Sequence, residues 1–138
     1  MTGETKIDTL EQARAFFRND RFATVNGMTI EDAGPDRAVV RLELNETHYN
    51  AVGGVMGGVM FTLADFACAV ASNFGTDTGV FVSTGADISY LRGTKGSVLT
   101  AEAVCIKKGR NIKVYDIPVT DDLGTMTAKA TFTVFGVQ

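Results

Sequence analysis

The residue with the clearest chemical potential in this chain is Asp65. It lies within the apolar run Phe61-Thr62-Leu63-Ala64-Asp65-Phe66-Ala67-Cys68. A carboxylate among such neighbours loses hydration, which favours its neutral form and raises its pKa towards the range useful for a general base. The alternatives are an aspartate that faces solvent on a narrow polar stripe, or one that caps a nearby backbone segment. Because Thr62 and Ser72 are the only polar residues near its helical face, we favour the catalytic interpretation.

A glycine-rich loop, residues 50–58, precedes Asp65 and has the sequence Asn-Ala-Val-Gly-Gly-Val-Met-Gly-Gly. Its spacing does not match the GxGxxG dinucleotide motif, and no Lys-Ser/Thr pair follows its last glycine as in a P-loop. Free backbone N–H groups at the start of a helix stabilise anions. The loop therefore predicts an oxyanion hole with the Gly57 N–H as its main donor. The simpler alternative is a set of glycines that serve only a tight turn and close packing.

Gly57 and Asp65 are too far apart to act on one carbonyl group from within one chain. They are eight residues apart in the sequence, which is about 12 Å along a helix. A general base and an oxyanion donor must flank a single carbonyl carbon. Two chains with antiparallel, side-by-side helices can supply one group each, and symmetry then gives two equal sites. The sequence therefore predicts a homo-oligomer with active sites between subunits.

A basic segment, residues 92–113, points to a phosphorylated substrate. It holds six lysines and arginines and one acidic residue, a net charge of +5 in a chain whose total charge is −3. Arg92, Lys108 and Arg110 lie at or beside its two turns, where they are placed to clamp phosphate groups. The alternative is a pair of solvated hairpin ends.

A helix and a sheet are needed to position these residues. The apolar run predicts a buried helix from about Gly57 to Phe74. A membrane span is the less favoured alternative, because Asp65 lies at its centre. A capping box at Thr9 predicts a short helix to about Arg18, within an N-terminal extension of residues 1–20.

The rest of the chain has the pattern of a sheet. Alternation and turn residues predict strands over 21–33, 37–45, 80–91, 98–107, 112–119 and 126–134. The short connections favour an antiparallel meander, and hence one α+β domain over residues 1–138. A single small sheet covers only one side of an apolar helix, which is a second reason to expect a dimer.

The composition excludes several classes of protein. A length of 138 residues with 21% charged residues fits one folded domain. The acidic balance without tryptophan argues against a nucleic-acid binder, and a single histidine, His48, leaves a zinc site short of ligands. Cys68 and Cys105 form no CxxC motif and are expected to be buried thiols. Residues 1–20 lack the apolar segment of a signal peptide, so we expect a cytoplasmic protein with no membrane association.

The loop and the helix together resemble a known signature. Hotdog-fold acyl-CoA thioesterases carry the pattern Asn…Gly-x-His-Gly-Gly…Leu-x-Asp, which this chain matches with Asn50, Gly54-Val55-Met56-Gly57-Gly58 and Leu63-Ala64-Asp65. The similarity is greatest to the phenylacetate-pathway type and covers about residues 35–136. It implies a long central helix wrapped by a curved antiparallel sheet, in dimers that often pair into tetramers. It also implies hydrolysis of an aryl or medium-chain acyl-CoA to the free acid and CoA, with no cofactor other than the CoA of the substrate.

The same resemblance implies roles for individual residues. Asp65 is the general base or the nucleophile, and the partner subunit's Gly57 donates to the thioester oxygen. The partner subunit's Asn50 helps to place the carbonyl group or water, and Ser83 matches a polar residue that holds the attacking water in some members. Gly58 and Met56 are expected beside the substrate.

Met56 departs from the family pattern, because it stands where the family has histidine. A thioether cannot donate a hydrogen bond, although the Gly57 N–H is unaffected. The change allows reduced activity, an altered acyl preference, or a non-catalytic protein that binds or senses acyl-CoA. His48 is a candidate to replace the missing ring, a loop-packing histidine being the simpler interpretation. A hydratase fits poorly, since related hydratases depend on a histidine with an acidic partner.

Overall fold

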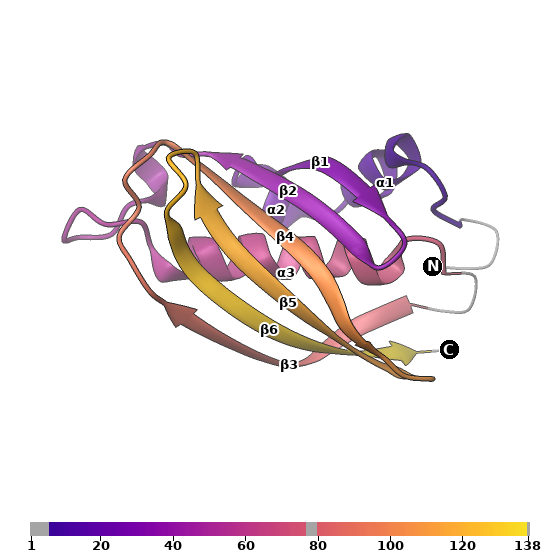
Figure 1. The fold of residues 1–138 in the computed structure, drawn as a ribbon. Helices are drawn as coiled ribbons and strands as arrows, with labels where there is room; N and C mark the ends of the chain where they lie inside the picture. The colour runs from indigo at the N-terminus through magenta and orange to yellow at the C-terminus, as the bar shows by residue number, and fades with distance from the viewer. Residues whose placement is uncertain (1–5, 77–79, 138) are drawn as a thin grey trace.

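The structure is a computed structural model and describes residues 6–76 and 80–137. Six antiparallel strands form one curved sheet around the long helix α3, Gly57–Asn73 (Figure 1). The strands are β1 Thr29–Gly34, β2 Arg37–Glu43, β3 Val80–Tyr90, β4 Val98–Lys108, β5 Ile112–Asp121 and β6 Met126–Val137. This is the hotdog arrangement, which confirms the predicted fold class.

The strand order, β1-β2-β4-β5-β6-β3, corrects the predicted meander. Strands β1 and β2 pair as consecutive neighbours, as do β4, β5 and β6, but β3 pairs with β6 instead of β2 or β4 and forms one edge of the sheet. The link from β3 to β4 crosses the end of the sheet, where the carboxylates of Asp121 and Asp122 accept hydrogen bonds from the backbone amides of residues 95–98. A short connection shows that two strand ends are near each other, and it does not show that the strands pair.

Helix α3 is buried on the side that faces the sheet and is accessible on the other. Leu63, Ala64, Ala67 and Val70 are completely buried. The accessible side is a narrow stripe, which we call the α3 stripe, made of Gly58, Phe61, Thr62, Asp65 and Ala69. Its members are three or four residues apart, the spacing of one helical face. The prediction of a buried helix is confirmed, with this stripe as its one open side.

The N-terminal region holds one confirmed prediction and one error. Helix α1, Leu10–Phe17, begins at the predicted capping box, in which Thr9 and Gln12 bond each other's backbone amides. The strand predicted over residues 21–33 is wrong in its first half, because Arg21–Val25 form the short helix α2. The side chains of Thr24 and Asn26 bond carbonyls four residues earlier, and Gly27 then ends the turn with a φ of 90°.

The two cysteines are free thiols in different environments. Cys68 is buried, as predicted, and its burial raises the pKa of the thiol to about 12, so it stays neutral. Cys105 is only half-buried, so that part of the prediction is wrong. Among the helices of residues 6–76 and 80–137, none has the length and apolar character that crossing a membrane requires.

Candidate functional site

Asp65 lies in the middle of the α3 stripe and is half-buried. Burial raises the pKa of its carboxyl group, and the negative charge of Asp20 raises it further, while a hydrogen bond with Ser83 lowers it. The net shift is upward, as the apolar sequence around Asp65 predicts. Asp20 is the N-cap residue, immediately before α2. Sequence reasoning missed this second acid because it assigned the segment after residue 20 to a strand.

Two local features bring Ser83 to Asp65, namely the hydrogen bonds of the Asn73 side chain and a bulge in β3. The side chain of Asn73, at the end of α3, accepts a hydrogen bond from the Phe81 N–H at 2.8 Å and donates one to the Phe81 carbonyl at 3.2 Å. This pair of bonds fixes the start of β3 against the helix. The pairing of β3 with β6 then slips between Ser83 and Gly85, and such bulges change the direction of a side chain. The structure therefore brings Ser83 and Asp65 together within one chain.

Gly57 is the first residue of α3, and Tyr90 holds it in place. The N–H groups of a helix's first turn have no carbonyl partner within the helix. The Tyr90 hydroxyl donates a hydrogen bond to the Gly57 carbonyl at 3.1 Å. A Cβ on Gly57 would lie 3.0 Å from the Tyr90 ring, so a larger residue here would push the ring outward. Sequence reasoning missed Tyr90, whose only signal was its place at the end of a strand.

The loop before α3 is organised by its own side chains. The Asn50 side-chain oxygen accepts hydrogen bonds from the N–H groups of Val52 and Gly54, both at 3.1 Å. Its oxygen thus shapes the loop, which leaves the amide nitrogen as the group to offer a substrate. Met56 is 52% exposed beside the start of α3, and its N–H donates to the His48 carbonyl at 2.9 Å.

His48 is buried, and both ring nitrogens bond the backbone. Nδ1 accepts from the Asn45 N–H, and Nε2 lies 3.0 Å from the Asn26 carbonyl, the geometry of an Nε2–H donor. The ring therefore joins the loop before α3 to the turn after α2. Because both ring nitrogens are bonded to the backbone, this arrangement favours the simpler interpretation of a loop-packing histidine.

Two cavities open beside the start of α3, one on each side of Tyr90. The apolar cavity, about 440 Å³, is lined by Met28, Met56 and Phe61 among others, with Gly58 and Thr62 from the α3 stripe. The Arg92 cavity, about 430 Å³, is lined by Gly57, Met60, Arg92 and Thr94 among others. An apolar space and a cationic space thus meet at the helix end that carries the free amides.

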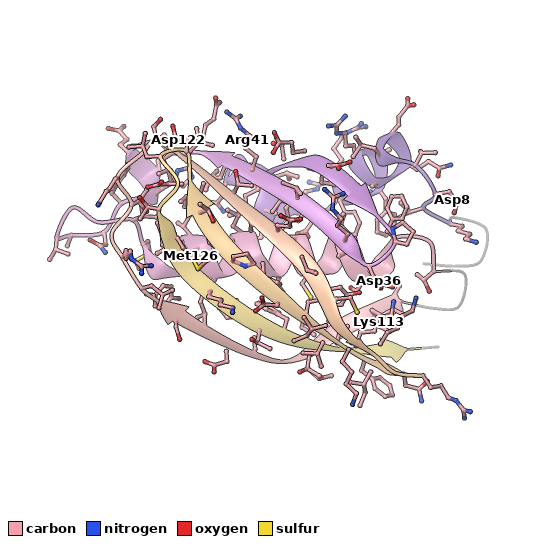
Figure 2. The ribbon with its side chains drawn as sticks, viewed as in Figure 1. Asp8, Asp36, Arg41, Lys113, Asp122 and Met126 are labelled. Atoms are coloured by element: carbon pink, nitrogen blue, oxygen red, sulfur yellow. The ribbon has the colours of Figure 1, made fainter. Side chains whose placement is uncertain are left out.

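The predicted phosphate clamp is divided between the two ends of the sheet. Arg92 donates a hydrogen bond to the Met126 carbonyl, whereas Lys108 forms a 2.8 Å ion pair with Asp36. Met126 and Asp36 are far apart along the sheet in Figure 2. Within one chain Arg92 therefore does not meet Lys108 and the neighbouring Arg110, and only Arg92 lies beside the start of α3.

Asp36 is the centre of a separate polar cluster at that far end. It accepts from Lys108 and Lys113, and from the Tyr115 hydroxyl at 2.6 Å. Figure 2 shows Asp36 and Lys113 close together where β5 begins. Burial raises the pKa of Asp36, but these three bonds outweigh it and lower the pKa to about 2. The cluster ties the β1–β2 turn to the β4–β5 hairpin, so Lys108 has a structural partner.

Known proteins resemble this chain over most of its length. Residues 12–135 match the family described as "Domain of unknown function (DUF4442)". The acyl-coenzyme A thioesterase PaaI of Escherichia coli K12 is 32% identical over 112 residues, 80% of this chain and 79% of that protein. A putative esterase of Deinococcus radiodurans is 38% identical over 99 residues, 71% of this chain and 66% of that protein, so the chain spans just under two thirds of its length.

Solved structures show the same relationship. The E. coli PaaI protein from the phenylacetic acid degradation operon superposes with a TM-score of 0.84 at 28% identity, covering 91% of both chains. The smu.793 protein of Streptococcus mutans UA159, solved bound to acetyl-CoA, has a TM-score of 0.73 at 29% identity, covering 80% of this chain and 89% of that one.

Fold, helix signature and relatives together define a hotdog-fold thioester hydrolase. More narrowly, the chain belongs to the PaaI-type acyl-CoA thioesterases, the group that the sequence signature indicated.

Proposed function

We propose that this protein hydrolyses an acyl-CoA thioester to the free acid and CoA at sites shared by two copies of the chain. The observation that carries the proposal is the α3 stripe. It presents a carboxyl group of raised pKa, Asp65, and begins beside the unpaired amide of Gly57. Because about 12 Å of helix separates these two residues, one copy supplies the base and the other the oxyanion donor.

The accessible surface around Asp65 supports a pairing of two copies. Phe61 lies next to it on the α3 stripe, and β3 beside it is a sheet edge whose residues 82–87 are exposed on both faces. Unpaired strand edges and accessible apolar side chains are features that association covers. We propose a two-fold dimer with antiparallel α3 helices, and a further pairing into tetramers as the family resemblance implies.

In the proposed reaction, the Asp65 carboxylate removes a proton from a water molecule that Ser83 holds. The water oxygen attacks the thioester carbonyl carbon, and the negative charge that develops on the carbonyl oxygen is stabilised by the N–H of the partner subunit's Gly57. The carbon–sulfur bond then breaks, and the CoA sulfur leaves with the proton that Asp65 received. The raised pKa of Asp65 suits both proton transfers.

The two cavities beside Tyr90 suit the two parts of this substrate. The Arg92 cavity offers a cation for the CoA arm, and the apolar cavity offers methionine and phenylalanine side chains to the acyl group. Asp121 accepts hydrogen bonds from the amides of Lys95 and Gly96 and so shapes the loop that carries Arg92. We propose that the reaction needs no cofactor beyond the substrate's CoA and takes place in the cytoplasm, where free thiols such as Cys68 and Cys105 persist.

Replacing Asp65 with asparagine tests the proposal. The amide keeps the size of the side chain but cannot take up a proton, so we expect thiol release from butyryl-CoA and phenylacetyl-CoA to fall by about a hundredfold or more. Calorimetric binding of the substrate should persist, and the association state should not change. A fully active Asp65→Asn protein would remove Asp65 from the mechanism. Wild-type protein that binds these esters without hydrolysing them would favour the non-catalytic alternative that Met56 raises.

A further inference from the structure

A third cavity, which we call the rear cavity, lies behind the apolar cavity, on the other side of α2. It has a volume of about 480 Å³ and lies between α1, α2 and β1. Its inner wall is apolar, formed by Phe17, Ile30 and Phe66, and its rim carries Arg14, Arg18 and Arg41. The residues of α2 and its following turn divide the two spaces, because Phe22 and Asn26 line the apolar cavity whereas Thr24 lines the rear cavity.

One side chain lines both spaces. Among the residues that the structure describes around these two cavities, Met28 alone belongs to the linings of both. It is 3% exposed and follows the turn that ends α2. An unbranched thioether side chain at such a position fills the space between the cavities without a polar group of its own.

We propose that Met28 is the end wall of the acyl site and determines the longest acyl chain that the enzyme accepts. This inference depends on the proposed thioesterase function and on the acyl group occupying the apolar cavity. Short and aryl acyl groups end against Met28 in this arrangement. A longer saturated chain must displace the Met28 side chain to enter the rear cavity, where Phe17 and Phe66 form an apolar surface that suits it.

The wall is held in place from two sides. The Met28 N–H donates to the Ala23 carbonyl at 3.0 Å, which closes the turn after α2. The buried His48 ring bonds the Asn26 carbonyl in the same turn. These bonds hold the backbone at Met28 in place. The longest acyl chain that fits therefore depends on the side chain of Met28 and not on movement of the loop. Buried His48 thereby acts on the acyl site from a distance, through the backbone.

The test compares hydrolysis of butyryl-, phenylacetyl-, octanoyl- and dodecanoyl-CoA. In wild-type protein, kcat/KM should be lower for dodecanoyl-CoA than for the esters whose acyl groups fit the apolar cavity. Met28→Ala should raise the ratio of kcat/KM for dodecanoyl-CoA to that for butyryl-CoA by about tenfold, since a few methylene groups gain a buried apolar site. Met28→Val, a smaller change, should give an intermediate ratio and retains a readout if the alanine variant does not fold.

Met28→Leu is the matched control, because it keeps the volume of the side chain and should keep the wild-type ratio. The result that overturns the inference is an unchanged ratio in folded Met28→Ala or Met28→Val protein that still hydrolyses butyryl-CoA. Wild-type protein that hydrolyses dodecanoyl-CoA as well as butyryl-CoA would overturn it too, while leaving the proposed function in place. Wild-type protein that hydrolyses none of the four esters would overturn both.

Discussion

Replacing Gly57 with alanine tests whether the start of α3 takes part in the reaction. A Cβ on Gly57 would lie 3.0 Å from Cζ and 3.1 Å from Oη of Tyr90, whereas unstrained carbon contacts lie at about 3.5–4.0 Å. The Tyr90 ring must therefore retreat by roughly 0.5 Å or more. Because 52% of Tyr90 is exposed, the ring can swing outward, and its 3.1 Å bond to the Gly57 carbonyl is then lost.

Stability and activity should respond differently to this change. The lost hydrogen bond costs about 0.5–1.5 kcal/mol, and alanine in place of glycine in a helix recovers up to about 1 kcal/mol. The free energy of unfolding should therefore fall by no more than about 1.5 kcal/mol. The N–H and the carbonyl of Gly57 are attached to the same Cα. When the carbonyl loses its bond to Tyr90 and shifts, the N–H that serves as oxyanion donor shifts as well. We expect kcat to fall by about tenfold to a hundredfold, the cost of a displacement of about 1 Å.

The assay is thiol release from butyryl-CoA together with urea unfolding of each variant. Gly57→Ala/Tyr90→Ala removes the collision, so its kcat should exceed the value expected from adding the two single effects. Gly34→Ala is the control, because its Cβ would enter open space at the β1–β2 turn. Gly57→Ala protein with wild-type kcat would refute the reasoning that the Gly57 amide contacts the reacting carbonyl group.

Two further predictions concern the surroundings of the site. Asp65 acts as a base only when ionised, and its pKa is raised by the Asp20 charge and lowered by the Ser83 hydrogen bond. Asp20→Asn should therefore move the acid limb of the kcat/KM profile to lower pH, and Ser83→Ala should move it to higher pH. An acid limb that neither variant moves would show that another group titrates. His48→Ala should lower the free energy of unfolding by about 2–4 kcal/mol, since two buried backbone groups lose their partners; a change below about 1 kcal/mol in urea unfolding would contradict this structural role.

The parts of the molecule that could be predicted from the sequence are those with a local signal. Asp65 is recognisable because one acid interrupts an apolar helical run, and its pKa is raised by the burial that this run implies. The α1 capping box is equally local. The segment after residue 20 was predicted as a strand because Phe22 and Val25 are apolar, yet both are exposed on the short helix α2.

The parts that could not be predicted depend on contacts between distant segments. The pairing of β3 with β6 joins residues about fifty positions apart, and nothing in the short link after β3 indicates it. Lys108 and Arg110 belong to one continuous basic segment with Arg92, but the length of β4 carries them to the opposite end of the sheet. His48 could not be assigned either, because its partner on the far side, the Asn26 carbonyl, is 22 residues away.

The half-buried position of Asp65 makes catalysis and association dependent on each other in the proposed dimer. A second copy over the α3 stripe removes more water from the carboxyl group than the single chain does, which raises its pKa further. The dimer then binds protons more tightly than the monomer, so the dissociation constant of the dimer should rise as pH increases through the acid limb of the rate profile. Sedimentation equilibrium across that pH range measures the effect, and Asp65→Asn protein should lack it. A dissociation constant with the same pH dependence in both proteins would mean that the second copy covers some other surface.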